Sequence, residues 1–186
     1  MINELITLDG NILLFIQEYL RNSIFTPIFK IITSLGDAGF IWIIITFALV
    51  INKKTRRVGY ICILSLLGTL IINNIILKNV VARVRPFNAV PGLAALIAEP
   101  VDFSFPSGHT AVSFSAAVVI YRNCPKKYGV PAIVLACLIA ISRLYLGVHY
   151  PSDVLAGIIS GVSIAYFSQY VMNLISKYYN LSNKVK

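Results

Sequence analysis

Long apolar blocks separated by short polar segments constrain the fold of this chain more than any other feature. Residues 58–77 form an uninterrupted block of 20 residues, enough for about 30 Å of helix, which matches the hydrocarbon core of a bilayer. Charged residues make up only 12% of the chain, about half the share of a soluble domain. The blocks lack the alternation of a β-barrel, so the sequence predicts an all-α, polytopic transmembrane helical bundle. The other predicted spans are residues 107–121, 129–146, 153–176 and a shorter block, 40–51, that begins near Asp37.

The N-terminal 35 residues give a weaker pattern. Apolar positions in residues 1–20 are interrupted by acidic ones, which favours an amphipathic helix at the membrane interface. Arg21, Asn22, Pro27 and Lys30 then break any ordinary span. We therefore expect five spans plus an outer interfacial segment, with six spans as the alternative. The predicted organisation is one membrane domain over 1–186, with the N-terminal segment at 1–35, the core bundle at 37–176 and a cytoplasmic tail at 177–186.

The basic residues predict the orientation of the chain. Three regions hold ten of the 16 lysines and arginines and no acidic residue, so the positive-inside rule assigns them to the cytoplasm of a multi-pass plasma-membrane protein. Because these charges lie in joints between apolar spans, the net charge of +9 does not predict a nucleic-acid partner. The ten residues are Lys53, Lys54, Arg56, Arg57, Arg122, Lys126, Lys127, Lys177, Lys184 and Lys186.

This topology brings all seven acidic residues and both histidines of the chain to the outer face. Three short segments there carry residue types suited to chemistry. They are Lys78-x6-Arg85-Pro86, Pro106-Ser107-Gly108-His109, and Ser142-Arg143-x5-His149-x3-Asp153.

The three cations Lys78, Arg85 and Arg143 are suited to binding phosphate oxygens, and two of them are guanidinium forks. Ser107 and Gly108 lie at an expected helix start, where free amides and the helix dipole favour an anion. Each residue alone is also compatible with snorkelling or capping. Together they predict an oxyanion cage for a phosphoryl group.

The histidines divide the predicted reaction between them. Asp153, in the first turn of the last span, is placed to hold one nitrogen of His149 and leave the other free to attack phosphorus. His109 is placed to protonate the leaving oxygen and then to activate water. The expected reaction is a two-step displacement through a phosphohistidine. Two histidines and one aspartate are thin ligation for a metal, and the cations would repel one, so neither a metal nor another cofactor is expected.

The three segments resemble the signature of the type 2 phosphatidic acid phosphatases, membrane lipid phosphatases whose site is similar to that of vanadate-dependent haloperoxidases. The resemblance covers roughly residues 30–176, and Val84 stands where many members have a second proline. It implies that Lys78, Arg85, Ser107, Gly108, His109 and Arg143 bind phosphate. It also implies that His149 is the nucleophile paired with Asp153, that His109 is the general acid, and that catalysis needs no divalent metal and is inhibited by vanadate.

An outer site at the interface favours an amphiphilic substrate. The resemblance points to undecaprenyl diphosphate, a carrier lipid of wall synthesis, with phosphatidylglycerophosphate or phosphatidate as alternatives. A phosphotransferase that passes the phosphoryl group to another lipid stays open. A transporter is disfavoured because no acid accompanies Asn73 and Asn74 within their span. The spans argue against a haloperoxidase, since those proteins are soluble.

Overall fold

The computed structural model describes residues 2–182, and every regular element in that range is helical. This confirms the predicted all-α class. Lys184 and Lys186, part of the predicted cytoplasmic tail, lie outside the described residues. The elements are α1 (Ile2–Phe15), η1 (Ile16–Leu20), α2 (Phe25–Leu35), η2 (Asp37–Gly39), α3 (Phe40–Ile51), α4 (Arg56–Thr69), η3 (Leu70–Leu77), α5 (Lys78–Val81), α6 (Pro86–Ala89), α7 (Gly108–Asn123), α8 (Lys126–Tyr145) and α9 (Pro151–Ser182).

Three helical stretches are long and apolar enough to cross a membrane: Arg56–Ala89, Lys126–Tyr145 and Pro151–Tyr178. A fourth candidate is the pair Phe25–Leu35 and Asp37–Ile51, which together pass the same criterion but are bent by 46°. The sequence placed the start of this span near Asp37, and the structure extends the apolar unit back to α2. Pro27 does not prevent this, because it lies in the first turn of α2, where a helix needs no amide from it.

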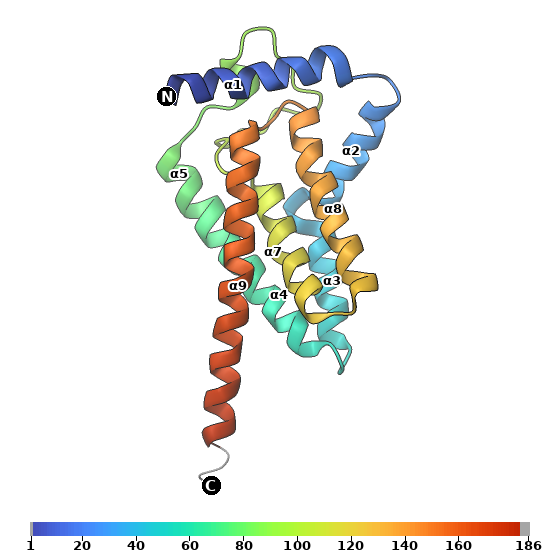
Figure 1. Ribbon diagram of the computed structural model, residues 1–186, viewed down its shortest axis with the longest axis vertical. Coiled ribbons are helices and arrows are strands. Elements are labelled where there is room, and N and C mark those ends of the chain that lie inside the picture. Colours follow the sequence, from blue (N-terminus) through green and yellow to red (C-terminus); the bar gives the residue numbers. More distant parts are fainter. Residues whose placement is uncertain (1, 183–186) are drawn as a thin grey trace.

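Helix α7 lies in the middle of the bundle and packs against α4, α8 and α9 (Figure 1). Glycines let α7 and α9 approach closely: a Cβ on Gly157 would lie 2.8 Å from the carbonyl oxygen of Ser107, and one on Gly161 would collide with that of Ala111. Small residues four apart are a common device for packing membrane helices. This contact also fixes the start of α7 beside the start of α9, where the amide of Ser107 donates to the carbonyl of Asp153 at 3.1 Å.

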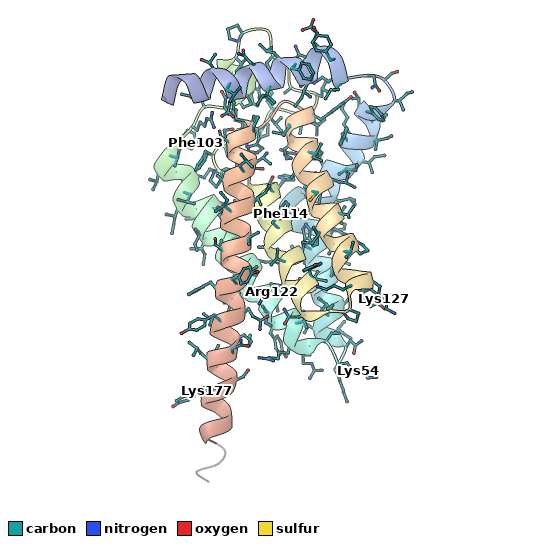
Figure 2. All side chains as sticks on the ribbon, viewed as in Figure 1. Lys54, Phe103, Phe114, Arg122, Lys127 and Lys177 are labelled. Atoms are coloured by element: carbon teal, nitrogen blue, oxygen red, sulfur yellow. The ribbon has the colours of Figure 1, made fainter. Side chains whose placement is uncertain are left out.

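The two ends of the bundle differ in character. Helix α1 lies across one end of the bundle, over the end turns of the other helices (Figure 1). Lys54, Arg122 and Lys127 lie toward the opposite end, whereas Phe103, in the long joint before α7, lies near α1 (Figure 2). The predicted basic joints and the predicted reactive segments are therefore at opposite ends of the molecule.

Candidate active site

The three predicted reactive segments meet at the end of the bundle that α1 covers. They border a single cavity of about 1140 Å³ that also extends between α3 and α4. The cations come from the end of the α4–α5 helical stretch, from the residue before α6 and from the last turn of α8. The predicted site residues that border this cavity are Lys78, Arg85, Gly108, His109, Arg143 and His149.

Both arginines are buried, and hydrogen bonds to neighbouring protein groups fix their positions. Arg85 donates from Nε to the carbonyl of Asp102 at 2.7 Å and from Nη1 to the carbonyl of Val148 at 2.8 Å. Arg143 donates from Nη1 to the hydroxyl of Thr33 at 2.5 Å. Its Nε is buried and has no hydrogen-bond partner among the described residues. Because a buried guanidinium donor without a partner is costly, this Nε is suited to an anion that enters the cavity.

Asp102 already places a carboxylate in the cation cage. Its Oδ1 accepts from Arg85 Nη2 at 2.5 Å, and its Oδ2 pairs with Lys78. Burial alone would raise the pKa of Asp102, but the hydrogen bonds and charges of Lys78 and Arg85 lower it to about 2. The side chain is still 51% exposed toward the cavity. The cage therefore holds an anionic group in a position that a phosphate would share or take over.

His149 lies between the cage and Asp153. Its Nε2 is 3.3 Å from Arg85 Nη1, and its Nδ1 is 3.5 Å from Asp153 Oδ2. Burial lowers the pKa of His149 to about 3; Asp153 opposes that shift, and the charges of Arg143 and Arg85 reinforce it. The imidazole is thus neutral at pH 7, with one nitrogen directed to the carboxylate and the other to the cage. The Nδ1 contact is long for a hydrogen bond, as is common before substrate binds.

The start of α7 supplies Gly108 and His109. A Cβ on Gly108 would lie 2.9 Å from Asn74 Oδ1, so a larger residue here would require the Asn74 side chain on the neighbouring η3 π-helix to move. Ser107 is buried, and its hydroxyl accepts from Thr110 at 2.9 Å. Since the Ser107 amide is bonded to Asp153, the helix-start donors left for phosphate are those that follow it.

His109 is paired with a carboxylate that the sequence analysis did not assign to the site. Its Nε2 lies 2.9 Å from Asp37 Oδ1. Asp37 stands at the break between α2 and α3, where Ala38 and Gly39 both have positive φ. The break turns Asp37 toward the cavity, which it borders. Each histidine of the chain therefore has its own aspartate.

Away from the cage the cavity is apolar. Its walls come from α3 on one side and from α4 and η3 on the other. Several wall side chains, including Phe47 and Leu67, are more than half exposed, so the cavity is open between α3 and α4, where lipid would lie against the bundle. The apolar wall residues are Ile43, Phe47, Val50, Ile63, Leu66, Leu67 and Leu70.

Sequence reasoning missed Asp37, Asp102 and Thr33 as members of the site. The positive-inside rule placed both aspartates at the same face as the three predicted segments, and that position was the available signal. Thr33 lies in a segment predicted to be interfacial, so nothing in its neighbourhood indicated contact with Arg143.

Comparison with known proteins agrees with this geometry. The profile of the PAP2 superfamily matches residues 58–177. The chain belongs to the PAP2 superfamily. The undecaprenyl-diphosphatase of Sulfolobus acidocaldarius is 32% identical over 166 residues, 89% of this chain and 71% of that protein. The undecaprenyl-diphosphatase BcrC of Bacillus subtilis is 30% identical over 148 residues, 78% and 74% of the two chains.

A solved relative extends the likeness to three dimensions. The crystal structure of the transmembrane PAP2-type phosphatidylglycerolphosphate phosphatase from Bacillus subtilis has a TM-score of 0.76 and 28% identity, covering 93% of this chain and 88% of that one. The predicted family and the helical membrane fold are both confirmed. The protein is a PAP2 membrane lipid phosphatase, and all three of its signature segments lie at one end of the bundle.

Proposed function

We propose that this PAP2 phosphatase hydrolyses a lipid phosphate or diphosphate, with an undecaprenyl-type diphosphate as the first candidate, through a phosphohistidine at His149. The observation that carries the proposal is the shape and polarity of one cavity. Three buried cations and two histidines close its polar end, and its apolar length opens sideways between α3 and α4. A substrate with a phosphate at the interface and a tail in the bilayer fits both parts.

The first step forms a bond between His149 and phosphorus. The Nε2 lone pair attacks the phosphoryl group, while Nδ1–H remains directed to Asp153. The bond between phosphorus and the leaving oxygen breaks, and His109 gives that oxygen a proton. Asp37 on Nε2 of His109 leaves the other ring nitrogen for this transfer and stabilises the imidazolium. Lys78, Arg85 and Arg143 neutralise the charge on the phosphoryl oxygens.

The second step returns the enzyme to its starting state. Water attacks the phosphorus of the phosphohistidine, and neutral His109 accepts the proton that the water loses. The bond between phosphorus and Nε2 breaks, and inorganic phosphate leaves the cage. If a second lipid hydroxyl takes the place of water, the same intermediate gives phosphoryl transfer.

The proposed lipid rests on relatives and on the cavity. Two relatives are named for undecaprenyl diphosphate, and the solved structure above is named for phosphatidylglycerolphosphate. A diphosphate and a monophosphate both fit three cations, so phosphatidylglycerophosphate or phosphatidate is the second candidate. We also propose that the site faces away from the cytoplasm, because the basic joints lie at the other end of the bundle (Figure 2).

The test is phosphate release from undecaprenyl diphosphate by purified protein in EDTA, beside phosphatidylglycerophosphate and a soluble aryl phosphate. We expect release from a lipid that resists EDTA, is blocked by vanadate and is absent in His149→Ala. Alkaline quenching with labelled lipid should trap a phosphoenzyme in the wild type and none in the variant. Thermal unfolding shows that the variant is folded.

Three outcomes would contradict the proposal. Faster turnover of the aryl phosphate than of any lipid would remove the lipid assignment. Near-normal activity of folded His149→Ala would remove the phosphohistidine. Label that moves to an added lipid hydroxyl instead of to water would make the protein a phosphotransferase.

A further inference from the structure

A chain of charged contacts runs from Asp153 away from the phosphate cage. The Asp153 side chain is fully buried. Its Oδ2 accepts from the hydroxyl of Ser104 at 2.5 Å and from the amide of Tyr150 at 2.9 Å. Its Oδ1 accepts from Arg83 Nη1 at 2.7 Å. Asp153 is thus shared between His149 on one side and a guanidinium on the other.

Arg83 is held by a second carboxylate. Its Nη2 donates to Asp9 Oδ2 at 2.8 Å, and its Nη1 also donates to the hydroxyl of Ser152 at 2.6 Å. The guanidinium carbon lies 3.7 Å from the ring centroid of Tyr150. Arg83 does not border the cavity, in contrast to Arg85 two residues later. Its position suits it to orient Asp153, whereas Arg85 faces the substrate.

Asp9 links this chain to the N-terminal helix. It is only 3% exposed, and its carboxylate also accepts from the amide of Ser152 at 3.1 Å and from the Ser152 hydroxyl. Asp9 therefore contacts both the arginine and the first turn of α9, which carries Asp153. It lies outside the part of the chain that the superfamily profile matches, residues 58–177.

Helix α1 is anchored where Asp9 meets the bundle. One turn after Asp9, the fully buried Leu13 packs in a cluster with Leu93 and Tyr150. The opposite side of α1 exposes large apolar side chains such as Leu8 and Phe15. A helix lying across the end of the bundle (Figure 1) with one apolar side exposed is typical of one seated in the membrane interface.

We propose that Asp9 is a positioning residue for the nucleophile His149. Helix α1, which carries Asp9, is therefore needed for full activity of the site. Asp9 binds Nη2 of Arg83, so only Nη1 of the guanidinium binds Asp153. This limits how strongly Arg83 attracts the Asp153 carboxylate. Without Asp9, both halves of the fork are free to bind Asp153, and the carboxylate is pulled from Nδ1 of His149. The imidazole then loses the partner that fixes its tautomer and its direction of attack. This inference rests on the proposed function of His149.

The distinguishing test is Asp9→Asn in the full-length protein, compared with Glu18→Gln. Glu18 lies on the same N-terminal segment but is exposed. Its variant therefore removes an equal charge at a position outside the chain of charged contacts. For Asp9→Asn we expect the single-turnover rate of phosphoenzyme formation at saturating undecaprenyl diphosphate to fall about tenfold to hundredfold, the scale found for outer partners of metal-ligating histidines. KM and inhibition by vanadate should change less than about twofold, because Asp9 does not border the cavity. Glu18→Gln should match the wild type.

A second variant separates positioning from general stability. Arg83→Lys keeps the charge but loses the fork that orients Asp153, so we expect a loss of rate of similar size with unchanged vanadate inhibition. Wild-type rates in Asp9→Asn would overturn the inference while leaving the phosphatase assignment intact. Parallel losses of rate, vanadate inhibition and thermal midpoint would also overturn it, because they indicate damage to the whole fold. No turnover by the wild type on any lipid would remove the proposed function and this inference together.

Discussion

At the residue scale, Asp102 bears directly on how tightly phosphate binds. Its carboxylate pairs with Lys78 and Arg85, so an incoming phosphate has to compete for both cations. Asp102→Asn removes that competition and raises the positive charge of the cage. We expect vanadate to inhibit this variant about fivefold to tenfold more tightly, the span of a coupling of about 1 kcal/mol or slightly more. A titration of lipid turnover with vanadate measures this change.

The matched control is Glu99→Gln, which removes an acidic charge from the same joint and the same cavity wall without an ion pair to the cage. Its inhibition by vanadate should stay within about twofold of the wild type. Equal inhibition of Asp102→Asn and wild type would show that phosphate binds beside Asp102 without displacing it.

His149 gives a prediction about pH and stability. Burial lowers its pKa to about 3 in the native state, whereas an unfolded histidine titrates near about 6.5. Between these values the unfolded chain binds a proton that the native protein does not. Stability therefore falls as pH falls through this window. From pH 7.5 to 5 the thermal midpoint of the wild type should drop more than that of His149→Asn, which lacks the group.

Unfolding followed by tryptophan fluorescence in detergent measures both curves, and His109 is present in both proteins. Parallel curves would mean that His149 becomes protonated in the native state over this range.

The site residues differ in how far sequence could predict them. Lys78, Arg85 and His149 follow from motif chemistry, because fixed spacing and a shared membrane face suffice to bring them together. Asp37 and Asp9 could not be assigned, since their contacts depend on how two N-terminal helices fold back over the bundle. No local sequence pattern predicts that a carboxylate from a distant part of the chain will contact His109 or Arg83.

At the scale of elements, the close contact of α7 with α9 holds Ser107 beside Asp153. Gly161→Val places a branched side chain against the carbonyl of Ala111. We expect it to destabilise the protein by about 1–3 kcal/mol, the usual cost of overpacking, and to lower turnover. Ile159→Val is the control, because Ile159 is exposed on the same helix.

Thermal midpoints and lipid turnover of both variants provide the measurement. A Gly161→Val protein with wild-type stability would show that α9 can move away from α7 without loss.

The elements themselves were largely predictable, and the exception is instructive. The length of the apolar blocks was sufficient to predict the helices α4, α8 and α9. The predicted block 40–51 became α3, and its expected start near Asp37 is the start of η2. The sequence did not predict that α2 forms an apolar pair with this helix, bent by 46°. The break depends on positive φ at Ala38 and Gly39, and alanine gives no signal of that conformation. The same break directs Asp37 to His109.

At the scale of the whole molecule, the separation of basic joints from the cage predicts which end faces out. Positive charge on short joints is retained in the cytoplasm, so the end that carries Lys54 should be inside and the joint before α7 outside. Val101 in that joint is fully exposed. A cysteine at Val101 should therefore react with a membrane-impermeant maleimide on intact cells, and one at Lys54 should react only after the cells are opened.

The natural thiols need separate treatment in this experiment. Cys62 is buried in the bundle, and Cys137 is half-buried within α8. Cys124 is half-buried in a joint at the basic end, where burial raises the pKa of its thiol. Both engineered cysteines therefore belong in a Cys124→Ser background that retains turnover. The reverse labelling pattern would place the cage in the cytoplasm and exclude any lipid whose phosphate is presented only outside. The expected pattern would restrict the substrate to lipids of the outer leaflet, where diphosphate carriers and glycerophospholipids could then be compared directly.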